Sequence, residues 1–206
     1  MSNINPDALR KIGYGLYVLT AHDGGKDNGC VVNVVAQVTD TPLQMLVTVN
    51  KKNLTHDMID RTGLFNVSML TESTPMEMIK HFGFQSGHNT NKFEGWANDT
   101  RSQNGLIYLP QHSNSYISGR VVNKVDLGTH TLFIAEVTEA VKLNDAPSLT
   151  YNYYQQHIKP QGTAATSTVT RWVCQVCGYV YEGENIPDDF VCPWCKHGKT
   201  DFVKAT

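Results

Sequence analysis

Four of the five cysteines in this 206-residue chain lie close to its end, as two pairs, Cys174-x-x-Cys177 and Cys192-Pro193-Trp194-Cys195. A segment this short buries too little apolar surface to fold unaided, so it needs a metal or disulfides. The start of the chain lacks a basic stretch followed by an apolar one, and without a secretion signal a metal is the better choice. We therefore expect a small metal-bound domain at the end of the chain.

The spacing of the four cysteines predicts one tetrahedral metal site with Cys174, Cys177, Cys192 and Cys195 as ligands, because each short loop lets two thiolates converge on one ion. Spacing alone fits a structural zinc and a redox-active iron equally. The aromatic residues around Cys-Gly-Tyr-x-Tyr and Cys-Pro-Trp-Cys resemble a rubredoxin, and this resemblance favours one iron. The chain departs from the rubredoxin pattern in a shorter loop between the pairs and in Phe190, where a tryptophan is usual.

Residues 159–169 are small and polar and show no apolar period, so they predict a connector. We expect three parts: a first domain over 1–158, a linker over 159–169 and the metal domain over 170–206. Four acidic residues of the metal domain predict either a solvated loop or a docking surface for a basic redox partner: Glu182, Glu184, Asp188 and Asp189.

The first domain is expected to be mainly β, an antiparallel barrel with a few helices. Six runs rich in β-branched and aromatic residues are broken by turn residues, and the clearest turn covers residues 22–29. In the last run Phe133, Ala135 and Val137 alternate with more polar residues, as in a barrel wall. The six predicted strands are 14–20, 30–38, 43–49, 64–70, 116–125 and 131–141; the predicted helices are a capping box at Thr74-Pro75-Met76-Glu77 with its helix to Gly83, a helix from 53–55 to Gly63, and one over 149–157.

Composition narrows the partners. The chain is 40% hydrophobic with a formal charge of −2, which excludes a disordered protein and gives no large cationic surface for nucleic acid or anionic lipid. No apolar run approaches the roughly 18 residues that span a membrane. We expect a cytoplasmic protein that binds neither nucleic acid nor membrane.

An iron held by four cysteines carries one electron, whereas biological reductants deliver hydride, so a flavin is the natural converter between them. The chain has no dinucleotide fingerprint: Gly13-Tyr14-Gly15 lacks the third glycine, and no phosphate loop of the Gly-x-x-x-x-Gly-Lys type is present. A flavin would therefore bind to a different scaffold.

Four segments identify that scaffold by resemblance. They are residues 28–39, 49–56, 82–87 with Lys92-Phe93, and 128–137. These segments resemble the flavin-reductase family, whose fold is an FMN-binding split β-barrel, and the likeness covers about residues 8–158. With its tail, the whole chain resembles the high-molecular-weight rubredoxins, in which a flavin-reductase domain is fused to a rubredoxin-like domain. The resemblance implies FMN, one iron, NADH or NADPH as hydride donor, a homodimer and a flavodiiron protein as electron acceptor.

The resemblance also assigns site residues. Asn50, Lys51, Asn53 and Thr55 lie where a strand meets a helix start. Taken alone, this segment favours an ordinary N-cap at Asn53 or Thr55 beside a solvated Lys51, but the resemblance assigns its amide, hydroxyl and cationic groups to the FMN phosphate. Thr48 and His56 flank this group. The run Asn28, Gly29, Cys30, Val31, Val32 and Asn33 would face the polar edge of the flavin ring, with Cys30 either beside the ring or a small buried hydrophobe. The resemblance makes His130 the candidate catalytic residue, positioning the nicotinamide; taken alone, a single histidine on a strand is a hydrogen-bonded structural residue.

From these features we expect an NAD(P)H-dependent electron-transfer flavoprotein that passes electrons through FMN to an iron held by four cysteines and on to a flavodiiron-type reductase of dioxygen or nitric oxide. Two alternatives stay open at this point. One is a flavin reductase whose tail holds a structural zinc, and the other is a non-enzymatic FMN and iron carrier that a separate reductase loads.

Overall fold

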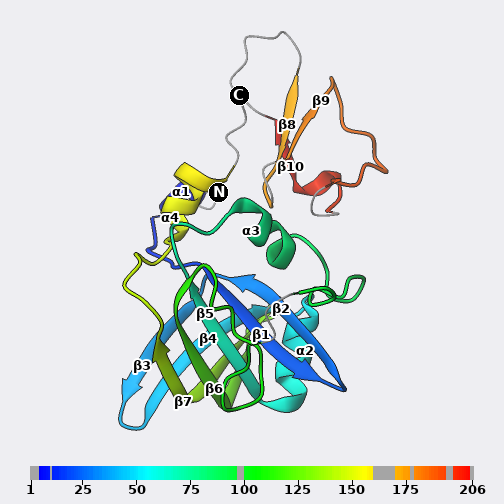
Figure 1. The fold of residues 1–206 in the computed structure, drawn as a ribbon. Coiled ribbons are helices and arrows are strands. Elements are labelled where there is room, and N and C mark those ends of the chain that lie inside the picture. The colour runs from blue at the N-terminus through cyan, green and yellow to red at the C-terminus, as the bar shows by residue number, and fades with distance from the viewer. Residues whose placement is uncertain are drawn as a thin grey trace.

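The computed structural model describes residues 5–9, 11–96, 100–159, 170–176, 179–193 and 197–204. Most of the chain forms one curved antiparallel sheet, and the end of the chain forms a smaller sheet beyond a helix (Figure 1). The large sheet has seven strands in the order β2-β1-β5-β6-β7-β4-β3. Their bounds are β1 Tyr17–Asp23, β2 Lys26–Val32, β3 Val35–Asp40, β4 Leu43–Asn50, β5 Leu64–Leu70, β6 Ser113–Asp126 and β7 His130–Lys142.

The first hairpin is tighter than the sequence predicted. Asp23 pairs with Lys26, so the turn consists of Gly24 and Gly25 alone, with φ of 57° and 79°. Positive φ at both central residues is typical of the two-residue turns that match the twist of paired strands, and glycine adopts it without steric cost. The predicted turn over residues 22–29 was therefore too long, and its second half is paired strand.

The predicted strand over 30–38 is two strands. The chain leaves β2 after Val32 and enters β3 at Val35. These two strands are the opposite edges of the sheet, so the sheet curls until its edges meet at Asn33 and Val34. This closure confirms a mainly β, barrel-like first domain.

Alternation along β7 agrees with the predicted barrel wall. Phe133 and Ala135 are fully buried, and Val137 packs against the same core. This core also contains Leu19, Val47, Met58 and Phe65, which come from both β-strands and α2, Leu54–Thr62. Helix α2 ends at Gly63, whose φ of 70° and N–H···O bond to Ile59 close the helix, as expected.

Helix α3, Met76–Gly83, starts differently from the prediction. Pro75 is its N-cap residue and no side chain caps it. The Thr74 hydroxyl instead donates to the carbonyl of His112, 3.2 Å away, so the predicted capping box is not formed. A tertiary acceptor has replaced the local one. The helix still buries Met78, Ile79 and Phe82 in a second core.

The remaining helical segments are short. They are α1 Pro6–Leu9, α4 Tyr151–Tyr153 and the π-helical turn η1 Tyr154–Ile158, the last two covering all but the first two residues of the predicted helix over 149–157. The Thr150 hydroxyl accepts a hydrogen bond from the Tyr153 N–H at 3.1 Å and caps α4. No helix in the part of the chain that the structure describes is long and apolar enough to cross a membrane.

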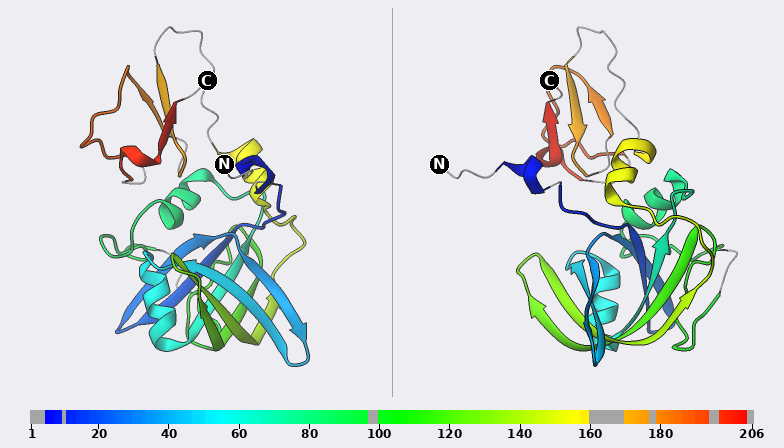
Figure 2. Two further views of the ribbon diagram at one scale, coloured as in Figure 1. Left: turned by 180° about the vertical axis from the view of Figure 1, so that it is seen from behind. Right: turned by 90° about the vertical axis from the view of Figure 1, so that its left-hand side faces the viewer.

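The tail is a three-stranded sheet with the order β10-β8-β9. Its elements are β8 Arg171–Cys174, β9 Val180–Glu182, the 3-10 turn η2 Lys199–Asp201 and β10 Phe202–Lys204. Cys174, Ile186, Cys192 and Phe202 form its core. All three views show α3 between the large sheet and the tail (Figure 2). Residues 160–169 of the predicted linker lie outside the described residues.

Candidate functional site

Strand β2 carries much of the predicted flavin site, and it lies between two helices. On one face, Asn28 Nδ2 donates to Thr55 Oγ1 of α2 at 2.9 Å. On the other face, Gly29 lies against Phe82 of α3, where an added β-carbon would be 3.2 Å from the ring. Alternation along the strand therefore directs Asn28 and Cys30 toward α2 and the barrel core, and Gly29 and Val31 toward α3.

Asn28 is 1% exposed, and its Oδ1 has no hydrogen-bond partner in the structure. An unsatisfied buried polar atom costs about 1–3 kcal/mol unless water or a ligand meets it. The Nδ2 of the same amide donates to Thr55 in the first turn of α2, and Oδ1 lies against Gly87 of the loop after α3. A ligand that brought a hydrogen-bond donor to this amide would satisfy the oxygen.

The first turn of α2 meets the end of β4 and the start of β7. Asn53 is the N-cap residue, yet its side chain makes no capping bond, so the helix end keeps N–H groups for an anion. Lys51 stands beside it and binds Asp126 Oδ1 at 2.6 Å. Asn50 pairs with His130 across β4 and β7. The candidate catalytic histidine therefore lies near the residues that are predicted to hold the FMN phosphate.

The two predicted histidines are both hydrogen-bonded. His56 is buried, and its Nε2 lies 2.9 Å from Thr131 Oγ1. Its Nδ1 lies 3.0 Å from Asp57 Oδ1, so both ring nitrogens have partners. His130 is half-buried and its Nδ1 lies 2.9 Å from Thr129 Oγ1. His130 is therefore the more accessible of the two.

Not every predicted residue joins this group. The Val32 side chain lies in the barrel core, and Val31 faces Gly83 of α3. Asn33 lies in the connection between β2 and β3, and the Thr48 N–H donates to Val34 in the same connection. Cys30 is buried with hydrogen bonds to Thr55 and Asn53, and burial raises the pKa of its thiol, so it stays protonated at neutral pH.

In the tail, the two cysteine loops are built alike. The Cys174 N–H donates to the Tyr179 carbonyl at 2.9 Å, and the Cys192 N–H donates to the His197 carbonyl at 2.8 Å, each five residues ahead. Cys174 and Cys192 are both fully buried in one core. Two equivalent loops that direct their first cysteines into a shared interior fit a four-thiolate metal site. Cys177 and Cys195 lie outside the described residues.

Comparison with known proteins supports both domain assignments. The family model for the flavin reductase like domain matches residues 9–162, and that for the rubrerythrin, rubredoxin-like domain matches 172–203. The chain belongs to the flavin reductase-like family. It is 37% identical to the high molecular weight rubredoxin of Moorella thermoacetica over 95% of this chain and 97% of that one. It is also 41% identical to the ferric-chelate reductase (NAD(P)H) of Archaeoglobus fulgidus, over 79% and 95%.

An FMN-binding protein of Thermus thermophilus with bound 1-cyclohex-2-enone has a similar fold. Its TM-score is 0.61 at 17% identity, over 69% of this chain and 78% of that chain. The likeness confirms the fold of the flavin reductase-like domain. The tail is the rubredoxin-like domain.

Sequence reasoning missed Lys92. This side chain of the flavin reductase-like domain is 2% exposed, and its Nζ donates to the carbonyls of Gly29 and Phe82, each at 2.8 Å. Burial lowers its pKa, while the neighbouring Cys30 raises it. Lys92 thus ties α3 to β2. It stood in a segment that suggested the family, but no local pattern shows that a lysine will be buried.

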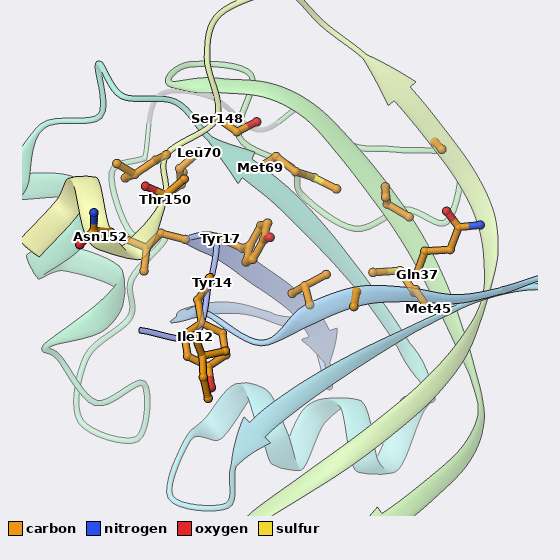
Figure 3. A pocket seen from close by; sticks show the side chains of 18 of the residues that line it. Ile12, Tyr14, Tyr17, Gln37, Met45, Met69, Leu70, Ser148, Thr150 and Asn152 are labelled. Atoms are coloured by element: carbon orange, nitrogen blue, oxygen red, sulfur yellow. The ribbon is translucent and has the colours of Figure 1, made fainter. Parts of the chain in front are cut away.

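A cavity of about 970 Å³ was also not predicted. It opens between the segment before β1 and the strands β3, β4, β6 and β7, and Tyr17, Met45 and Met69 are among its lining residues (Figure 3). Burial raises the pKa of Tyr17. None of the predicted flavin residues lines this cavity, so it is a separate feature of the flavin reductase-like domain.

The predicted acidic patch of the rubredoxin-like domain is partly neutralised. Glu182 binds Arg171 at 2.9 Å, and Asp188 binds Lys199 at 2.7 Å. In both ion pairs the carboxylate side chain is exposed to solvent. The hydrogen bond from Lys199 lowers the pKa of Asp188. Two intramolecular cations weaken the case for an acidic docking surface.

Proposed function

We propose that this chain is an NAD(P)H-dependent electron-transfer flavoprotein with FMN in its first domain and one iron in its tail. The observation that carries the proposal is the pair of equivalent cysteine loops, with Cys174 and Cys192 buried together, in a chain whose other domain is flavin reductase-like. When bound, FMN would accept the hydride of NAD(P)H, a pair of electrons, and an iron held by four thiolates would take these electrons one at a time.

The residues around α2 supply the flavin contacts in this proposal. The uncapped first turn of α2, with Lys51 beside it, would hold the phosphate. Asn28, with its unsatisfied Oδ1, would bind a donor on the flavin ring. His130, beside Asn50, would position the nicotinamide. The tail ligands would be Cys174, Cys177, Cys192 and Cys195.

The acceptor we propose is a flavodiiron protein, and the support for it is the resemblance to the high-molecular-weight rubredoxins. We also propose a homodimer. Three apolar side chains near the β6–β7 turn are about half exposed, which supports a surface that a second copy covers. They are Val122, Val125 and Leu127. Sedimentation of the purified chain at micromolar concentration tests this state.

The function is tested by recording the visible spectrum of the anaerobically purified protein during titration with NADH and, separately, NADPH. We expect overlapping flavin and ferric-thiolate bands that both bleach. Flavin bleaching with no iron band would instead establish a flavin reductase with a structural zinc tail. Two bands that neither nucleotide bleaches would establish a carrier loaded by another reductase.

The similarity to the ferric-chelate reductase favours a second candidate. That relative aligns with 79% of this chain, so the flavin reductase-like domain alone accounts for the match. The second candidate is an enzyme whose flavin reductase-like domain reduces ferric chelates and whose tail takes no part in the reaction. A chain with Cys174→Ser and Cys192→Ser that still reduces a ferric chelate at the full rate would support it.

A further inference from the structure

One aromatic side chain belongs to two cores. Phe84, just beyond the end of α3, packs against the second core of the flavin reductase-like domain and also against the core of the tail. Cys174, Ile186, Cys192 and Phe202 make up that tail core. Phe84 is the residue of the large domain that packs there among the described residues.

Two hydrogen bonds to the backbone at the end of α3 fix the position of Phe84. Its backbone N–H donates to the Lys80 carbonyl at 3.0 Å and closes the last turn of α3. The Phe82 carbonyl, two residues earlier, accepts from the buried Lys92 ammonium. Phe84 is therefore presented by a helix end that has its own hydrogen bonds and does not depend on the tail.

The same segment lies against the predicted flavin strand. Gly83 is so close to Val31 that an added β-carbon would be 3.3 Å from that side chain. Lys92 donates to Gly29, and Gly87 lies against Asn28. The segment 82–92 thus contacts β2 on one side and, through Phe84, the cysteine core on the other.

We propose that Phe84 is the docking residue that seats the cysteine-bearing tail on the α3 end of the flavin reductase-like domain, so that electrons pass within one chain through the segment 82–92. The partner that packs on Phe84 is the apolar core of the tail itself, which contains Cys174 and Cys192. This inference rests on the proposed function for its redox consequence, whereas the docking itself does not require a bound flavin.

The test uses the full chain and compares Phe84→Ala with Phe93→Ala. Phe93 is the matched control, because it is also half-buried and packs against the second core of the large domain but is absent from the tail core. Hydrogen exchange is measured on tail peptides that contain Ile186 and Phe202, about a hundred residues from the substitution in sequence. Phe84→Leu, which keeps an apolar side chain, guards against a general folding defect.

If Phe84 docks the tail, Phe84→Ala speeds exchange in the tail peptides about tenfold, Phe84→Leu speeds it less, and Phe93→Ala leaves it at the wild-type rate. In stopped-flow experiments with NADH, Phe84→Ala slows iron bleaching about tenfold and leaves flavin bleaching unchanged. Equal tail exchange in wild type and Phe84→Ala overturns the docking proposal. A wild type whose iron NADH never bleaches overturns the proposed function instead, and the exchange data still decide the docking.

Discussion

Gly87 lies so close to Asn28 that a β-carbon on Gly87 would be 2.4 Å from Asn28 Oδ1. The Asn28 side chain has no freedom to withdraw, because it is 1% exposed and hydrogen-bonded to Thr55. The loop after α3 and the strand predicted to hold the flavin are therefore fitted to each other without room for one methyl group.

Gly87→Ala is expected to lower the free energy of unfolding by about 1–3 kcal/mol, the usual cost of overpacking, and to weaken FMN binding. Fluorescence titration of the apoprotein with FMN and denaturant unfolding measure the two effects. Gly13→Ala is the control, since an added β-carbon there meets nothing within 4 Å. Equal FMN affinity in both variants would remove Asn28 from the proposed site.

Asn28→Ala is expected to weaken FMN binding about tenfold, corresponding to about 1.4 kcal/mol, because it removes the amide that we assign to the ring. The dissociation constant of FMN is the measurement. Asn123→Ala, an exposed asparagine on β6, is the matched control. In the apoprotein, Asn28→Ala removes an unsatisfied oxygen but also the buried hydrogen bond to Thr55, so the two effects on the free energy of unfolding partly offset each other.

Lys92→Met is expected to destabilise the fold by about 2–3 kcal/mol, since hydrogen bonds to a charged donor contribute that much and two buried carbonyls lose their partner. Denaturant unfolding measures the change. Lys52→Met, at an exposed lysine, should stay within about 0.5 kcal/mol of wild type. A Lys92→Met protein as stable as Lys52→Met would show that Gly29 and Phe82 find other donors.

The Asp27 carboxylate is expected to make the stability of the fold decrease at acidic pH. Burial alone would raise the pKa of its carboxyl, but hydrogen bonds from Arg101 and His22 outweigh burial and lower it below 3.8. Since the folded state binds the proton less tightly, the contribution is present above about pH 4, the unfolded-state value, and is lost as pH falls through the folded pKa. Asp27→Asn should thus unfold about 0.5–1 kcal/mol more easily at pH 7, and this difference should be smaller at about pH 3, below the unfolded-state value. Asp40→Asn, at an exposed carboxylate, is the control for denaturant midpoints at both pH values.

Cys192→Ser should abolish iron binding and leave FMN bound, because the serine hydroxyl is a poor substitute for a thiolate ligand. Metal analysis and the ferric-thiolate band report the first effect, and flavin absorbance reports the second. Cys30→Ala should keep the full metal content, since Cys30 lies in the barrel core. Iron retained at wild-type stoichiometry in Cys192→Ser would contradict the assigned ligand set.

Local patterns predicted much of this molecule and failed where distant segments decide. Alternation identified the strand of Phe133 and Ala135, and Gly63 marked the end of α2, because both signals act within a few residues. The spacing of the cysteines predicted a compact tail, and the structure places Cys174 and Cys192 in one core.

The rest depends on contacts that no short window contains. The Thr74 hydroxyl binds a carbonyl 38 residues away instead of capping its own helix. The burial of Lys92 depends on carbonyls from β2 and α3. The split of the predicted strand 30–38 follows from the closure of the sheet, which is a property of seven strands together.

The Lys92 contact also affects the edge of the large sheet at β2. β2 is an edge strand, and edge strands can template strand addition by other chains. An ammonium held against the Gly29 carbonyl puts a charge and a desolvation cost in the way of any incoming backbone. An added strand could pair with the Gly29 carbonyl only after displacing Lys92, so the lysine that ties α3 to β2 also leaves this edge one hydrogen-bond acceptor short for strand addition.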